Sequence, residues 1–152
     1  MSNKIHNANI ESEAVIASPA ALNAQLPLSE QARKNVIASR ATVGSILSGD
    51  DKRLMVIVGP CSIHDLEAAK EYAIKLKALQ EEVKDTLFLV MRVYFEKPRT
   101  TIGWKGLISD PDMDNSLDVN KGLYQGRQFL TGWLISACRQ PLKHLTLLHL
   151  NI

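Results

Sequence analysis

The sequence predicts an α/β fold built on parallel strands. Two short apolar runs, residues 54–58 and 87–93, are rich in aliphatic and β-branched side chains. They start about 33 residues apart, the usual length of a strand–helix–strand unit, and residues 66–83 between them carry a helical apolar repeat. Continuous apolar strands are typical of a parallel sheet covered on both faces, so we expect both runs to be buried.

Two helices and an arm are expected before the first strand. Ser18 and Pro19 form an N-cap with proline at the first helical position, which predicts a short helix. Ser29 is a second N-cap candidate, and a helical repeat of apolar residues runs from it to Gly49, a natural helix end. Residues 1–17 have little pattern and are expected to form an arm.

The helix between the strands begins at Asp65 or Ser62, since either residue can cap its first turn. Its predicted apolar face consists of Leu66, Ala69, Ala73, Leu76, Leu79 and Val83. Residues 94–118 lack periodicity, and an irregular stretch of about 25 residues in a compact domain is usually functional or disordered. A further helix is expected from Val119 to about Cys138.

Composition excludes several classes of protein. Eighteen basic against sixteen acidic residues leave a net charge of +2, which is too balanced for a nucleic-acid or membrane-surface protein. No apolar run approaches the ~20 residues of a membrane span, and the first twenty residues contain no secretory signal. Two cysteines are too few for a disulfide framework. We therefore expect a cytoplasmic protein without nucleic-acid or membrane partners.

The first candidate site follows the strand at residues 54–58. Gly59 and Pro60 force a tight turn that places Cys61 at the carboxyl end of the strand, where α/β folds put their chemistry. Cys61 is there a metal ligand, a nucleophile or an inert thiol, and the residues alone leave these alternatives open. His64 is either a second ligand or a residue that only caps or packs.

A cluster of cations and hydroxyls follows the second strand. Its members are Arg92, Lys97, Arg99, Thr100, Thr101 and Lys105. Arg92 falls within the apolar strand, and a buried unpaired charge is expensive, so a buried arginine implies an anion partner. Two cations and two hydroxyls around the rigid Pro98 suit a phosphate or a carboxylate, and the alternative is a salt-bridged surface loop.

Two motifs carry a family resemblance. VGPCSIHD at residues 58–65 and MRVYFEKPRTTIGWKGLISDPDMDNS at residues 91–116, with their spacing, closely resemble class I 3-deoxy-D-arabino-heptulosonate 7-phosphate (DAHP) synthase of the bacterial feedback-regulated type. The resemblance runs from about residue 15 to about residue 130. It implies a (β/α)8 TIM barrel with an N-terminal extension, of which this chain holds about two βα units.

The resemblance also implies a reaction and roles for single residues. DAHP synthases condense phosphoenolpyruvate with D-erythrose 4-phosphate to give DAHP and phosphate, the first step of the shikimate pathway to aromatic amino acids. Cys61 matches the family's cysteine metal ligand. Arg92 and Lys97 match residues that hold phosphoenolpyruvate, and Lys97 is also close to the reacting centre and is the expected catalytic residue. Arg99 and Thr100 match the cradle for the aldose phosphate.

A metal and further partners are implied in the same way. The family requires a divalent metal such as Mn²⁺, which would act as a Lewis acid on the aldehyde carbonyl. It also implies a homo-oligomer and an aromatic amino-acid effector, whose site the N-terminal arm helps to shape. The family's histidine, glutamate and aspartate ligands have no counterpart in these 152 residues. We therefore do not expect stable metal binding by this fragment.

The alternative to an active DAHP synthase is a catalytically inactive fragment of one. Two βα units cannot close a barrel, and an open sheet exposes a strand edge. A fragment of this kind has no independent activity.

The sequence changes character near residue 130. The last acidic residue is Asp118, and the final stretch does not resemble the family's third strand. Read out of frame, the codons of residues 136–146 can encode a family-like stretch, GLPAAxEALD. We therefore hypothesise a frameshift between Phe129 and Trp133, after which Cys138, His144 and His149 carry no selected chemistry.

Two other interpretations of this tail are weaker. Pro141 interrupts a membrane-surface helix, and the cysteine and histidines lack a recognisable zinc-ligand spacing. The chain is thus expected to divide into three parts. Residues 1–50 form an N-terminal regulatory and oligomerisation extension, residues 51–130 the first βα units, and residues 131–152 an out-of-frame tail.

Overall fold

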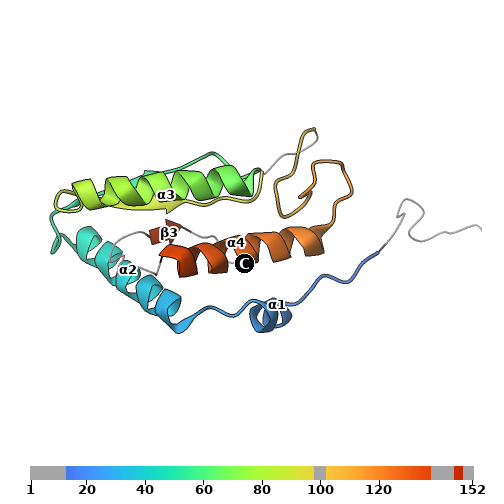
Figure 1. Cartoon of the computed structure of the whole chain (residues 1–152), viewed down its shortest axis with the longest axis horizontal. Coiled ribbons are helices and arrows are strands. Elements are labelled where there is room, and N and C mark those ends of the chain that lie inside the picture. The colour runs from blue at the N-terminus through green and yellow to red at the C-terminus, as the bar shows by residue number, and fades with distance from the viewer. Residues whose placement is uncertain (1–12, 98–101, 138–145, 149–152) are drawn as a thin grey trace, which may run out of the picture.

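The chain forms a parallel three-stranded sheet with helices packed around it (Figure 1). This computed structural model describes residues 13–97, 102–137 and 146–148. In chain order the elements are α1 (Pro19–Gln25), α2 (Glu30–Ser48), β1 (Leu54–Val58), α3 (Leu66–Val83), β2 (Leu87–Arg92), α4 (Val119–Ala137) and β3 (Thr146–Leu148). The predicted α/β class and the six predicted elements are confirmed. The third strand, β3, was not predicted.

The helix boundaries follow the capping residues. Ser18 and Ser29 each accept a hydrogen bond from an amide three residues further on, which satisfies a free N–H of the first turn. Gly49 ends α2 in the left-handed conformation, with φ of 83°. Asp65, and not Ser62, caps α3. None of the helices in the described ranges is long and apolar enough to cross a membrane.

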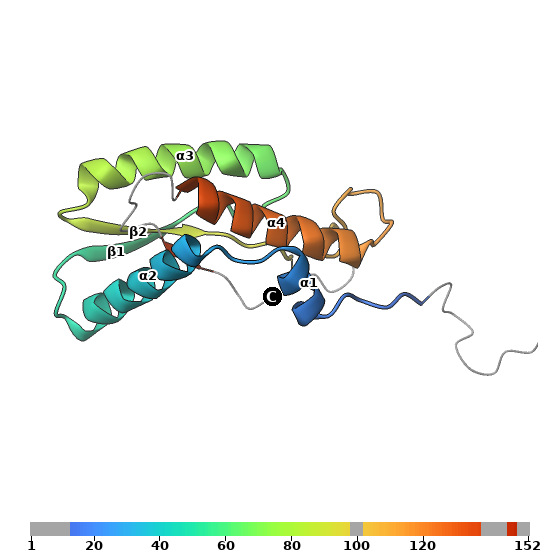
Figure 2. The ribbon, with the colours of Figure 1, turned by 60° about the horizontal axis from the view of Figure 1, so that its bottom comes forward.

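Strand β2 is the centre of the core. Its four residues from Phe88 to Met91 are each at most 3% exposed. On the face that carries Leu89 and Met91, side chains of α3 and α4 form one apolar cluster with buried residues of the irregular stretch after β2. Helix α2 contacts β1 and β3, and Figure 2 shows it across β1 and β2 from α3. The prediction of burial on both faces therefore holds for β2.

The same prediction is wrong for β1. Leu54 is 66% exposed and Ile57 is 49% exposed, although both belong to the apolar run. The reason is topological, because the sheet order β1-β2-β3 leaves β1 paired on one side only within the described residues. A strand at the edge of a sheet has fewer neighbours to cover its side chains.

The predicted apolar face of α3 is wrong at one position. Leu79 is 45% exposed, whereas its neighbour Gln80 is only 1% exposed. The Gln80 side-chain oxygen accepts a hydrogen bond of 2.9 Å from the backbone N–H of Leu89 in β2. A buried amide needs a partner, so the helix turns a polar residue inward at the position where the strand requires an acceptor.

The segment after β2 is irregular but held together by hydrogen bonds. Outside a single antiparallel bridge between Glu96 and Gly106, its described residues form neither helix nor strand before α4. The indole N–H of Trp104 donates to the carbonyl of Asp110 at 2.7 Å. The prediction of an irregular stretch over residues 94–118 is therefore confirmed for the residues that the structure describes.

Candidate active site

The carboxyl ends of β1 and β2 lie side by side and form the base of the candidate site. The parallel register pairs Val58 with Met91, which brings the turn after β1 next to Arg92. Gly59 has φ of 149°, and a Cβ at this position would lie 2.6 Å from the carbonyl oxygen of Arg92. Only glycine allows this approach. The predicted tight turn thus places Cys61 above the end of the neighbouring strand.

The site brings Cys61 and Lys97 into direct contact. The ammonium nitrogen of Lys97 lies 3.1 Å from the Cys61 sulfur, and the thiol is exposed and not part of a disulfide. The hydrogen bond from Lys97 lowers the pKa of the Cys61 thiol, the positive charge of Lys97 lowers it further, and Arg92 adds a smaller effect. The thiolate is the form of cysteine that binds metals and attacks electrophiles, so this environment favours a reactive cysteine over an inert one.

Arg92 is half-buried and reaches back over the turn. One guanidinium nitrogen donates to the carbonyl of Pro60 at 2.8 Å and also to the carbonyl of Cys61. The guanidinium carbon lies 4.9 Å from the centre of the Tyr94 ring, a favourable cation–π position. Arg92 therefore has partners for its charge within the chain. The expectation that a buried arginine here implies a bound anion does not follow from its burial alone. No ion pair among the described residues includes Arg92 or Lys97.

The backbone of Lys97 is fixed by the chain that returns from the loop. Its N–H donates to the carbonyl of Lys105 at 2.9 Å, next to the bridge between Glu96 and Gly106. Gly106 has φ of 112°, and any side chain there would collide with the backbone at Phe95. Two of the predicted cations, Lys97 and Lys105, are thus brought together through their backbones.

The predicted cation cluster has three further members. Arg99, Thr100 and Thr101 lie outside the described residues, as do Cys138, His144 and His149 of the tail. The binding roles expected of the loop residues, and the absence of selected chemistry expected of the three tail residues, stay predictions.

His64 is exposed and contacts Trp104, and a role as a second metal ligand stays a prediction. Its ring stands edge-on to Trp104, with the ring centroids 6.5 Å apart. In the described ranges no three histidine, cysteine, aspartate or glutamate side chains gather as ligands for a metal ion. The exposed Cys61 thiol has the chemistry of a single soft ligand, and it would need partners from elsewhere.

Two residues with specific contacts were missed by the sequence analysis. Asp110 is 3% exposed; one of its carboxylate oxygens accepts from the N–H of Asn115 at 3.3 Å, and the other has no partner among the described residues. Asn120 binds the backbone of residues 15–17, more than one hundred positions away. Asp110 was missed because the acidic run around it resembles a solvent-exposed turn. Asn120 was missed because no sequence pattern near it indicates a contact with residues more than one hundred positions away.

Comparison with known proteins identifies the family. The profile of the DAHP synthetase I family matches residues 23–145, a range that continues past residue 130. The Tyr-sensitive phospho-2-dehydro-3-deoxyheptonate aldolase of Escherichia coli is 54% identical over 126 residues, covering 83% of this chain and 35% of that protein. The Phe-sensitive enzyme of the same organism is 58% identical over 112 residues, covering 74% and 32%.

A solved structure agrees with these sequence matches. The phospho-2-dehydro-3-deoxyheptonate aldolase of Francisella tularensis superimposes with a TM-score of 0.80 at 46% identity, covering 85% of this chain and 38% of that one. The chain spans about a third of the length of the curated relatives it matches. By its sequence and its fold, the chain belongs to the DAHP synthetase I family.

Proposed function

We propose that residues 51–130 supply the first βα units of a (β/α)8 barrel with DAHP synthase activity. The reaction condenses phosphoenolpyruvate with D-erythrose 4-phosphate and yields DAHP and phosphate. The observation that carries this proposal is the contact between Lys97 and Cys61, with Arg92 beside it, at the carboxyl ends of two parallel strands. Active sites of (β/α)8 barrels lie at that end of the strands.

The cations of the site have the chemistry that the substrates require. Phosphoenolpyruvate carries a carboxylate and a phosphate, and charge-assisted hydrogen bonds from Arg92 and Lys97 would hold it in one orientation. Arg92 is already fixed by the carbonyls of Pro60 and Cys61, so little conformational entropy is lost on binding. Arg99 and Thr100 are proposed to bind the phosphate of the aldose, on the family resemblance alone.

Cys61 is proposed as one ligand of a divalent metal. Its exposed thiol, with a pKa lowered by Lys97, fits this role because a coordinating thiol must be deprotonated. The metal, when bound, supplies a Lewis acid that polarises the aldehyde carbonyl. Since the described residues provide no further ligands close by, the rest of the coordination sphere would come from other parts of the enzyme.

A chimera tests this proposal most directly. Residues 13–130 of this chain would be joined to the remaining two-thirds of the Phe-sensitive Escherichia coli enzyme, and Mn²⁺-dependent phosphate release would be measured. We expect turnover by the chimera and a loss of at least about a hundredfold with Lys97→Met. A folded, metal-loaded chimera without turnover would contradict the proposed function.

The alternative is that the 152-residue chain alone is inactive. It spans about a third of its relatives' length, and its described residues supply only Cys61 toward a metal site. In the same assay the purified chain is expected to release no phosphate above background. Turnover by the chain alone would overturn this alternative and leave the proposed reaction standing.

The division of the chain is also a proposal. Residues 1–50 would form a regulatory and oligomerisation extension, on the family resemblance alone, and the names of the Tyr-, Phe- and Trp-sensitive relatives support regulation by an aromatic amino acid. Residues 131–152 would be read out of frame, which is supported by the family-like alternative frame, whereas the match of the family profile as far as residue 145 speaks against it. Sequencing the gene across codons 125–135 tests the second point, and a confirmed reading frame without a family-like alternative would refute it.

A further inference from the structure

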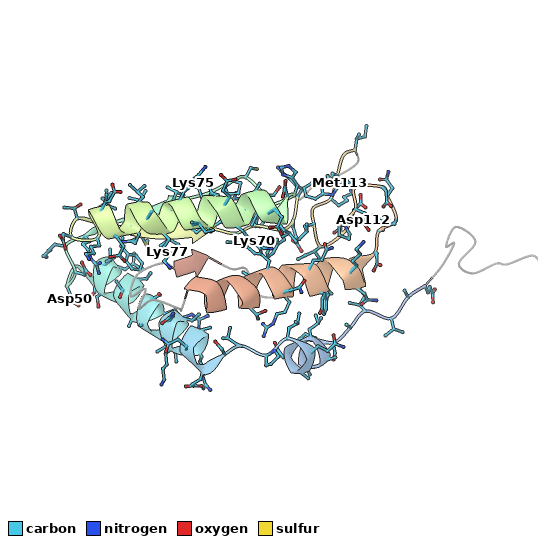
Figure 3. The ribbon with its side chains drawn as sticks, in the orientation of Figure 1. Asp50, Lys70, Lys75, Lys77, Asp112 and Met113 are labelled. Atoms are coloured by element: carbon cyan, nitrogen blue, oxygen red, sulfur yellow. The ribbon has the colours of Figure 1, made fainter. Side chains whose placement is uncertain are left out.

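Three consecutive residues in the first turn of α4 contact three separate parts of the chain. Asn120 binds the N-terminal segment, Lys121 binds the loop before the helix, and Gly122 lies against the backbone at Ile108. Figure 3 shows Asp112, the partner of Lys121, on the loop beside the start of α4. The turn therefore connects segments that are far apart in sequence.

Asn120 binds the N-terminal segment much as a neighbouring strand would. Its side-chain oxygen accepts from the N–H of Ala17 at 2.8 Å, and its side-chain nitrogen donates to the carbonyl of Val15 at 3.0 Å. These two groups flank Ile16 on the same edge of an extended backbone. Val15 is 93% exposed and Ile16 is 57% exposed, so apolar packing contributes little here. Asn120 thus holds Val15 and Ala17 through two side-chain hydrogen bonds.

The next two residues join α4 to the loop. The ammonium of Lys121 lies 2.7 and 2.6 Å from the two carboxylate oxygens of Asp112. Gly122 leaves no room for a side chain, because a Cβ would lie well inside contact distance of the Ile108 carbonyl. The first turn of α4 therefore lies directly against the backbone at Ile108 and is linked to Asp112 by an ion pair.

From there the contacts continue to the candidate active site. The N–H of Asp110 donates to the carbonyl of Gly106 at 2.9 Å, and Gly106 bridges to Glu96. The adjacent Lys105 carbonyl accepts from the N–H of Lys97 at 2.9 Å. An unbroken series of short contacts thus runs from the N-terminal segment to Lys97.

We propose that Asn120 is a positioning residue that couples residues 13–17 to the backbone holding Lys97. When Asn120 is hydrogen-bonded to Val15 and Ala17, the first turn of α4 and the loop before it are held in place. When these hydrogen bonds are broken, the backbone of the loop and of Lys97 becomes more mobile. The importance of Lys97 for substrate rests on the proposed function, but the mechanical coupling does not.

Hydrogen–deuterium exchange of the full chain tests the coupling. With Asn120→Ala we expect amide exchange to rise roughly fivefold in residues 13–17 and in residues 93–97 and 102–110, as loss of two exposed hydrogen bonds allows. Exchange in α3 should not change, and it serves as the internal reference. A rise confined to residues 13–17, or no rise anywhere, would overturn the proposal.

Two further variants make the result specific. Gln128→Ala removes another exposed amide of α4 and should leave exchange in the loop unchanged. Asn120→Asp keeps the acceptor for Ala17 but sets a carboxylate oxygen against the Val15 carbonyl, so Val15 should be released and exchange should rise in the same segments as in Asn120→Ala. The Arg127 side chain donates separately to the Leu26 carbonyl, which keeps the region after α1 attached in every variant.

Deletion of residues 2–17 controls for the possibility that Asn120→Ala acts only by unfolding α4, because it removes the partners of Asn120 without changing the helix. The deletion should reproduce the rise at residues 93–97 and 102–110, and adding Asn120→Ala to it should cause no further rise. If α3 also exchanges faster in Asn120→Ala, that variant has unfolded, and the deletion variant is used instead. Unchanged exchange at residues 93–97 and 102–110 in the deletion variant would refute the coupling. Because no activity is read, failure of this proposal is distinct from failure of the proposed function.

Discussion

The ammonium of Lys97 lies 3.1 Å from the thiol of Cys61, although 36 positions of sequence separate the two residues. The contact exists because β1 and β2 are parallel and end at the same edge, and because Gly59 lets the intervening turn approach Arg92. An exposed thiol next to a fixed cation is a reactive group. Its ionisation is therefore the most direct probe of the candidate site.

Replacing Lys97 by methionine should make Cys61 less reactive. Lys97 lowers the pKa of the thiol, so its removal returns that pKa toward the ordinary value. At neutral pH the thiolate fraction falls, and the pH profile of alkylation moves to higher pH. The measurement is iodoacetamide labelling of metal-free protein, followed at the Cys61 peptide by mass spectrometry.

Lys75→Met is the matched control for this experiment. Lys75 lies on the outer face of α3, paired with Glu71, and is 74% exposed (Figure 3). The variant makes the same change in net charge without touching the thiol. Equal profiles for Lys97→Met and Lys75→Met would show that the contact does not control the ionisation of Cys61.

Two leucines of α3 should differ in their contribution to stability. Leu76 is 6% exposed and Leu79 is 45% exposed. Leu76→Ala removes buried apolar surface and leaves a cavity, so we expect a loss of about 2–5 kcal/mol in the free energy of unfolding. Leu79→Ala should cost less than about 1 kcal/mol. Urea denaturation followed by circular dichroism measures both, and equal losses would contradict the exposure of Leu79.

Leu79 also shows where sequence reasoning fails. A helical repeat predicts which stripe of α3 is apolar, but it does not reveal that the amide of Leu89 needs an acceptor. This N–H belongs to another element, β2, and Gln80, which lies next to the apolar stripe of α3, accepts its hydrogen bond. Local patterns thus predicted the helix and narrowed its cap to Asp65 or Ser62, whereas the rotation of the helix about its axis depended on a partner in β2.

The same limit applies to the site. The turn at Gly59 and the cations at Arg92 and Lys97 were readable from residue type and position, since parallel strands end together. The exposure of Leu54 was not readable, because an apolar strand looks the same at a sheet edge and at its centre. Asn120 was also missed, since its partners come from the other end of the described chain.

Two glycines of α4 should respond in opposite directions to alanine. Gly122 has no space for a Cβ because of the Ile108 carbonyl, whereas a methyl group at Gly132 would meet no atom within 4 Å. Gly122→Ala should lower stability by about 1–3 kcal/mol through overpacking. Gly132→Ala should raise it by about 0.5–1 kcal/mol through helix propensity. Denaturation midpoints compare them, and stabilisation by Gly122→Ala would refute the close approach.

The turn at Gly59 should link the stability of the sheet to the reactivity of Cys61. In Gly59→Ala the new methyl would meet the Arg92 carbonyl at 2.6 Å in a backbone conformation that other residues rarely adopt. The turn must move away from β2, so we expect a loss of about 1–3 kcal/mol in stability together with slower alkylation of Cys61. Gly44→Ala in α2, where a methyl meets no atom within 4 Å, should increase stability and leave alkylation unchanged. If Gly59→Ala destabilised the chain but left the alkylation profile intact, the Cys61–Lys97 contact would not depend on this turn.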